Sequence, residues 1–175
     1  MNVMVIYKSR TGFTKRYAQW IGDELRCKVT DYGEIKKIDL DSYDLIIYGG
    51  RVHAGKIDNL DKVKSLLNNK KCDLIVFATG ATPFEATEEI EKTRNLNFSD
   101  NSIPYFYMQS GLCYEKMGFF DRTIMKMLSK MLAKKENKSD IDNGTAIAIS
   151  QSHDISDKSY IMPLVDYIKK NYSKA

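Results

Sequence analysis

Short apolar runs alternate with segments of helical periodicity along most of this chain, and this alternation restricts the folds open to it. The predicted strands are short and largely apolar, and they cover 3–7, 27–31, 44–50, 74–78 and 103–108. Apolar residues between them recur at spacings of three and four, which predicts amphipathic helices. Strands that alternate with helices predict a parallel sheet with helices on both of its faces.

Two of the predicted helices have informative ends. The tetrapeptide from Thr82 to Glu85 has the pattern of a helix start, with Thr82 as the capping residue and Pro83 in the first turn. The closing helix carries apolar residues from Ile161 to Tyr172, and Pro163 must lie in its first turn or kink it.

Length and composition fit one folded unit. The chain has 175 residues, of which 43% are apolar, so a single domain over 1–175 is predicted. No apolar stretch reaches the roughly 20 residues of a spanning helix. The first apolar run has neither a basic region ahead of it nor a small-residue cleavage site, so we expect it to be a buried strand rather than a secretory signal. Cys27, Cys72 and Cys113 have neither C-x-x-C spacing nor metal-ligand spacing with a histidine. We therefore expect no metal and a reduced, cytoplasmic setting.

Residues 119–134 have apolar side chains at helical spacing, which predicts an amphipathic helix outside the alternating pattern. Basic residues gather on this helix and just after it, at Arg122, Lys126, Lys130, Lys134, Lys135 and Lys138. The polar stretch 134–143 is expected to be mobile, and 145–149 fits either a short helix or a strand. The net charge of +4 is mild and no nucleic-acid-binding motif accompanies it, so no nucleic-acid partner is expected.

The hexapeptide Ser9-Arg10-Thr11-Gly12-Phe13-Thr14 joins the first predicted strand to the first predicted helix. At such a junction, unpaired backbone N–H groups and the positive end of the helix dipole face one point, which suits a phosphate. Three hydroxyl side chains add further hydrogen-bonding groups. The chain has neither G-x-x-x-x-G-K-[ST] nor G-x-G-x-x-G, so ATP and dinucleotide sites lose their main support.

Three segments that follow predicted strands, 8–14, 49–57 and 79–84, meet at one edge of such a sheet if the first strand is central. Each of them contains glycine, which permits close backbone approach. An isolated glycine is explained more simply by an ordinary strand-ending turn. The coincidence of three such segments nevertheless favours a shared ligand site.

The Ser9–Thr14 loop resembles the phosphate loop of flavodoxins, and the resemblance covers most of the chain. It implies a flavodoxin-like three-layer α/β/α sandwich, with a five-stranded parallel sheet of order 2-1-3-4-5 and an extra amphipathic helix after strand 5. The segment from Phe119-Phe120-Asp121-Arg122 to Met127 is similar to a subgroup containing the quinone-dependent protoporphyrinogen oxidases of flavodoxin fold. Phe120 stands where that subgroup has a tyrosine.

The resemblance implies FMN as the cofactor, with its phosphate on the Ser9–Thr14 loop and its ring between the other two segments. The candidate cofactor-binding residues are Ser9, Arg10, Thr11, Gly12, Phe13, Thr14, Gly50, Arg51, Val52, His53, Thr79, Gly80, Ala81 and Phe84. Many flavodoxins hold the ring between two aromatic side chains, whereas these segments supply only Phe84. Either the ring is stacked on one side, or Tyr114 or Phe119 covers its other face.

Arg51 and His53, which follow the third predicted strand, could affect the flavin potential and proton transfer. A cation such as Arg51 beside the ring would favour the anionic reduced flavin by Coulomb attraction, so we expect a higher potential than in acidic flavodoxins. His53 is a candidate catalytic acid or base because histidine titrates near neutrality. Its alternatives are packing in the loop or a hydrogen bond to the flavin.

The predicted function is FMN-dependent oxidoreduction, in which a protoporphyrinogen-like compound gives electrons to a quinone or a redox partner protein. Segment 111–135 would shape the site of this small planar substrate, and helix 119–135 could contact the inner face of a membrane. One alternative is a diffusible flavodoxin-type electron carrier without its own substrate. A second alternative is a non-catalytic FMN-binding module.

Overall fold

The computed structural model describes residues 1–134, 149 and 151–172. Two compact units make up the chain: one comprises Met1–Ser110 and Ser156–Ala175, and the other comprises Gly111–Ile155. The prediction of one domain over 1–175 stays a prediction. The expected mobile stretch after Lys134 lies outside the described residues, and so does the ambiguous segment 145–149 apart from Ile149, which is in a turn.

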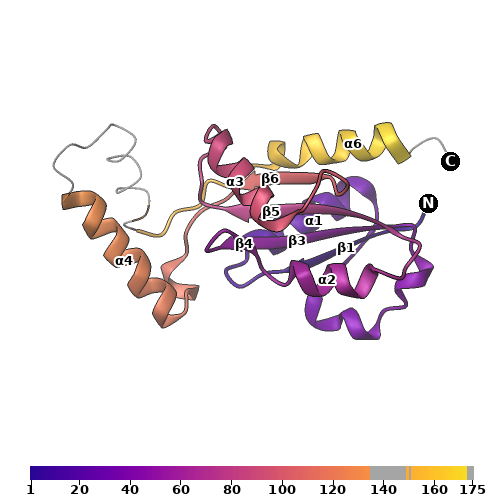
Figure 1. Ribbon diagram of the computed structural model, residues 1–175, viewed down its shortest axis with the longest axis horizontal. Helices are drawn as coiled ribbons and strands as arrows, with labels where there is room; N and C mark the ends of the chain where they lie inside the picture. Colours follow the sequence, from indigo (N-terminus) through magenta and orange to yellow (C-terminus); the bar gives the residue numbers. More distant parts are fainter. Residues whose placement is uncertain (135–148, 150, 173–175) are drawn as a thin grey trace. The chain divides into compact units, whose positions relative to one another are not determined.

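A six-stranded sheet lies at the centre of the first unit (Figure 1). Its five parallel strands run in the order β2 (Lys28–Asp31), β1 (Val3–Lys8), β3 (Leu45–His53), β5 (Asp73–Gly80) and β6 (Tyr105–Gln109). The short β4 (Lys56–Ile57) pairs antiparallel with the end of β3. The parallel strands therefore have the predicted order 2-1-3-4-5, and the predicted fold class is confirmed.

Helices cover both faces of this sheet (Figure 1). α1 (Phe13–Leu25) and α6 (Met162–Tyr172) pack on one face, and α2 (Leu60–Leu67) and α3 (Thr87–Asn97) lie on the other. Two 3-10 turns, Tyr32–Lys37 and Leu40–Ser42, also lie on the face covered by α2 and α3. Along β1, Met4 and Ile6 enter one core while Val5 and Tyr7 enter the other, because successive side chains of a strand point to opposite faces.

β3 extends to His53, beyond the predicted strand end at residue 50, and continues into a hairpin, so the prediction that 49–57 only follows the strand is wrong in this detail. Val52 and His53 pair with the two residues of β4, which leaves Ala54 and Gly55 as the turn. The φ angles of this turn are 49° and 77°, as required by the mirror-image turns that join twisted strands. Alanine in place of the usual asparagine gives this hairpin a weak sequence signature.

α3 begins at Thr87, so the predicted helix start with Thr82 as its cap is wrong. The carbonyl oxygen of Thr82 instead accepts a hydrogen bond from the Tyr107 hydroxyl at 3.0 Å. The Phe84 N–H donates to Gln109 Oε1, also at 3.0 Å. These two bonds to β6 hold the segment as a turn along the sheet, and such tertiary contacts override a local capping pattern.

The second unit contains α4 (Phe119–Lys134), which confirms the amphipathic helix predicted after strand 5. A 3-10 turn, Tyr114–Lys116, precedes it, and the Arg122 guanidinium donates to the carbonyl oxygen of the first residue of that turn. His153 exchanges two backbone hydrogen bonds with Leu112, at 2.9 and 3.0 Å. No helix in the described ranges is both long enough and apolar enough to cross a membrane.

Candidate functional site

The carboxyl ends of β1, β3 and β5 lie side by side at one edge of the sheet. The strand register pairs Lys8 with Gly50 and Arg51 with Thr79. The 9–14 loop, the hairpin and the turn after β5 therefore all leave the sheet at the same level. The structure brings the three predicted segments together at the edge where open parallel sheets bind ligands.

The Ser9–Thr14 loop ends β1 and begins α1, as predicted. Gly12 is the residue that caps α1, and its φ of 104° lies in the left-handed region that favours glycine. Its N–H donates to Ser9 Oγ at 3.1 Å. Within the described part of the chain, no side chain caps the first-turn amides of this 13-residue helix. Their unpaired donors and the positive helix end fit a phosphate group.

Thr14 and Thr79, two of the predicted cofactor-binding residues, contact each other. Their Oγ1 atoms lie 2.8 Å apart, and the residues are only 2% and 1% exposed. The bond uses one hydroxyl hydrogen, so the hydroxyl that accepts it keeps its own hydrogen for another partner. The pair holds the 9–14 loop against the end of β5.

Gly50 and Arg51 lie on the last part of β3. A Cβ atom on Gly50 would come within 2.7 Å of Ile57 Cγ2 and 3.0 Å of the Asp58 carbonyl oxygen, so the glycine lets the hairpin return close to β3. Arg51 Nε donates to Asp58 Oδ2 at 2.7 Å, in an ion pair whose side chains are 19% and 29% exposed. This carboxylate offsets the Arg51 charge on which the expected rise in flavin potential depends.

The remaining candidate residues differ in exposure. Arg10, His53 and Phe84 are exposed, Phe13 is buried, and Ser9, Thr11, Val52, Gly80 and Ala81 are half-buried. Because the Phe13 side chain belongs to the core, its backbone N–H is the group it can offer to a ligand. His53 lies beside the hairpin turn, and its catalytic role stays a prediction.

Two residues beside the site were missed by sequence reasoning. Gln109 Oε1, at the end of β6, accepts hydrogen bonds from the Phe84 N–H and from the Tyr160 hydroxyl, the latter at 3.2 Å. Tyr160 also packs on Phe84, with ring centroids 5.0 Å apart and ring planes 31° from parallel. No local pattern marks either residue, because both act through contacts distant in sequence.

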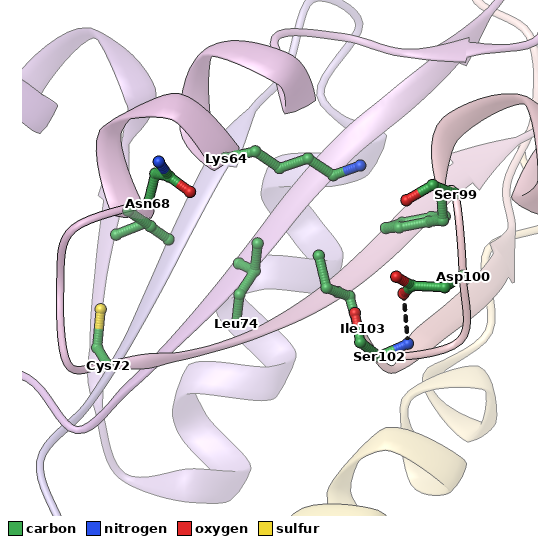
Figure 2. Close-up of a pocket in the computed structure, with 10 residues that line it drawn as sticks. Lys64, Asn68, Cys72, Leu74, Ser99, Asp100, Ser102 and Ile103 are labelled. Atoms are coloured by element: carbon green, nitrogen blue, oxygen red, sulfur yellow. Dashed lines mark hydrogen bonds between the residues drawn. The ribbon is translucent and has the colours of Figure 1, made fainter.

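A cavity of about 320 Å³ lies beside the start of β5 and the loop that leads to β6 (Figure 2). Both charged side chains of its wall already have partners: Lys64 Nζ donates to the Asn97 carbonyl oxygen at 2.5 Å, and Asp100 accepts the Ser102 N–H at 2.8 Å, as Figure 2 shows. Burial raises the pKa of the Cys72 thiol in its wall, which keeps that thiol protonated near neutrality. Across the described ranges, no three His, Cys, Asp or Glu side chains gather as a metal site would require.

Comparisons with known proteins give one family match. The family model of a flavodoxin domain matches residues 4–140. Similar solved structures include a flavoprotein in complex with FMN from Lactobacillus acidophilus, at 16% identity over 62% of this chain and 91% of that chain, with a TM-score of 0.42. The Trp repressor binding protein of Bacillus subtilis is 13% identical over 89% and 100% of the two chains, with a TM-score of 0.44. No curated protein matches.

Proposed function

The chain belongs to the flavodoxin domain family, and on that premise we propose that it is an FMN-linked oxidoreductase that passes electrons to a redox partner. FMN is the cofactor, and when bound it supplies one- or two-electron transfer. The observation that carries the proposal is the Ser9–Thr14 loop, in which left-handed Gly12 leaves the first amides of α1 without a side-chain cap. These amides would hold the phosphate at the edge where the three strand-end segments meet.

The other candidate residues would place the ring. Phe84, 40% exposed and supported from behind by Tyr160, would cover one face. Gly80, the last residue of β5, and Ala81, which follows it, would offer backbone groups on the same side as that aromatic residue. The hairpin with Arg51 and His53 would border the opposite side, where a histidine could exchange a proton with the ring or a substrate.

A finer proposal concerns the substrate and the acceptor. A protoporphyrinogen-like donor and a quinone acceptor are supported by the resemblance of segment 119–127 to the protoporphyrinogen oxidase subgroup. Tyr114 is 8% exposed and its hydroxyl donates to the Ile149 carbonyl oxygen, so its ring is committed to the second unit. Phe119, 78% exposed, is the better candidate to cover a planar ligand.

The test is the visible spectrum of the purified protein, followed by anaerobic reduction with NADPH and with protoporphyrinogen and reoxidation by a short-chain quinone. Flavin absorbance that protoporphyrinogen bleaches and the quinone restores supports the oxidase. Bleaching by a protein reductase alone supports the diffusible carrier, and a bound flavin that no donor reduces supports the non-catalytic module. A colourless protein that fails to take up added FMN contradicts the whole proposal.

Asp58→Asn is expected to raise the flavin midpoint potential, because it removes the carboxylate paired with Arg51 and leaves more positive charge near the ring. The expected shift is about 20–50 mV for a two-electron couple, from Coulomb energies of about 1–2 kcal/mol. Asp41→Asn is the matched control. It breaks an ion pair in which Asp41 Oδ2 lies 2.6 Å from Lys70 Nζ. These two residues come just before β3 and β5 in the chain, at the edge of the sheet opposite the proposed flavin site. Equal shifts in the two variants would contradict the placement of the ring beside the hairpin.

We also propose that α4 contacts an anionic membrane surface. Met127 and Met131 are 58% and 63% exposed, and Lys126 and Lys130 lie on the same helix. Replacing both methionines with glutamine is expected to weaken co-sedimentation with anionic vesicles about tenfold, since apolar burial and charge act together. Leu96→Gln, which changes a 56% exposed side chain on α3, is the control. Equal binding to neutral and anionic vesicles would overturn the idea.

A further inference from the structure

A cavity of about 300 Å³ lies along β6, the last strand in the sheet order. Residues of α3 form one side of it and residues just before and within α6 form the other. Its lining includes Phe84, Ile90, Arg94, Tyr105, Phe106 and Tyr160. We infer that this cavity binds a planar aromatic acid, a ligand that the proposed electron-transfer function does not require.

The walls of the cavity are aromatic on several sides. Tyr105 packs with the core beneath α3, whereas Phe106, the next residue of β6, packs with the core beneath α6. The Phe84 and Tyr160 rings, tilted by 31° to each other, line the end near the cofactor edge. Such walls suit a flat ring that stacks on one face and meets ring edges at its sides. The volume is at the low end for ligand pockets, which suits a bicyclic compound rather than a tetrapyrrole.

Two residues of the wall each carry a buried hydrogen-bond donor that finds no acceptor in the described part of the chain. Arg94 Nε and the Tyr105 hydroxyl are buried, and neither has a hydrogen-bond partner among the residues that the structure describes. Buried polar atoms normally have partners, so an acceptor is missing at this place. A carboxylate would accept from both donors and would be strengthened by the arginine charge.

The charges around the Tyr105 hydroxyl are consistent with this ligand. Burial raises the pKa of Tyr105 most, nearby Tyr107 and Glu91 raise it further, and Arg94 lowers it. The phenol therefore stays protonated and can donate at any ordinary pH. Glu91 is exposed, so water screens its repulsion of an anion more than it screens the attraction of the half-buried Arg94.

The cavity in Figure 2 has a similar volume and serves as a comparison. There, Lys64 and Asp100 already have hydrogen-bond partners within the protein. The cavity beside β6 differs in two ways: its two buried donors have no partner among the described residues, and half of the residues that line it are aromatic, with Glu91 as its one acidic residue. This combination of unmet donors and aromatic walls assigns the ligand class.

The test is a calorimetric titration of the FMN-loaded protein with 2-naphthoate and with the neutral analogue 2-naphthamide. We expect saturable one-to-one binding of 2-naphthoate, with amide NMR shifts confined to α3, β6 and the residues before α6. Arg94→Gln is expected to weaken binding about tenfold or more, since it removes a charge-assisted hydrogen bond. Tyr105→Phe keeps the ring and is expected to weaken binding about threefold to tenfold. The neutral analogue should bind wild type more weakly and lose less affinity on Arg94→Gln, because its carbonyl oxygen accepts a hydrogen bond without the charge attraction.

Lys92→Gln is the matched control because it removes one positive charge from the same helix. Lys92 pairs with Glu89 at 2.6 Å and does not line the cavity. The unfolding temperature and the FMN affinity of each variant show whether it is folded. If the Arg94→Gln variant does not fold, the binding affinity of the Tyr105→Phe variant decides the test. No saturable binding of 2-naphthoate at millimolar concentration, or equal weakening by Lys92→Gln and Arg94→Gln, overturns the inference. Either result leaves FMN binding, and with it the proposed function, unaffected.

Discussion

Thr11→Glu is expected to abolish retention of FMN while the protein stays folded. Thr11 lies in the 9–14 loop, directly before the residue that caps α1, and it is half-buried. A carboxylate there would lie next to the bound phosphate and repel it. Two unit charges about 4 Å apart near a protein surface repel by about 4 kcal/mol, so we expect FMN affinity to fall about 100-fold or more. Titration of the apoprotein with FMN, followed by flavin fluorescence, measures the loss.

The same variant should be slightly more stable without FMN, which separates loss of the site from loss of the fold. An acidic side chain at the positive end of a helix stabilises it by about 0.3–1 kcal/mol. Thr11→Gln, of similar size and without charge, is the control and should keep most of the affinity. Undiminished FMN binding by Thr11→Glu would show that the phosphate lies elsewhere. Thr14 is unsuitable for this test, because its buried hydroxyl is bonded to Thr79.

Gly49→Ala is expected to lower the stability of the fold severely. Gly49 pairs with Phe77 across the centre of the sheet, and a Cβ atom there would lie 2.0 Å from Phe77 Cζ. The Phe77 ring is fully buried and cannot move away without disturbing its neighbours. Overpacking of this kind costs about 3 kcal/mol, a large part of the roughly 5–15 kcal/mol that holds a domain together. Urea denaturation of the apoprotein measures the change.

A second substitution tests the cause. Phe77→Leu alone should destabilise by about 1–2 kcal/mol, because it removes buried volume. Combined with Gly49→Ala, it should cost clearly less than the sum of the two single changes, since the smaller side chain makes room for the methyl group. Additive losses would mean that the contact between these two residues is not the source of the destabilisation.

The parts of the fold that could be predicted are those with a local signature. The apolar run of β1 and the glycine-containing turn before α1 each lie within a few consecutive residues, and both are present as expected. The hairpin after β3 was missed because Ala54 takes a positive φ that a non-glycine residue rarely adopts. The start of α3 was misplaced because Thr82 has the chemistry of a cap but is bonded to β6.

In the candidate site, too, local features could be predicted from the sequence, whereas contacts between distant segments could not. The loop that would hold the phosphate could be found from its sequence, since the helix end and hydroxyls are neighbours along the chain. The support behind Phe84 could not, because it comes from Gln109 and Tyr160 in two other elements. The ion pair of Arg51 and Asp58 depends on the unexpected hairpin, and it changes the electrostatic argument made from Arg51 alone.

The hydrogen bond between the Thr14 and Thr79 hydroxyls couples the motion of the phosphate loop to that of the end of β5. A hydrogen bond of 2.8 Å between two buried side chains restrains both segments, so ordering one of them also orders the other. The binding free energies of the two ends of FMN should therefore be cooperative rather than additive. Riboflavin, which lacks the phosphate, would then lose more affinity than the phosphate contacts alone supply, because the ring would meet a less ordered partner.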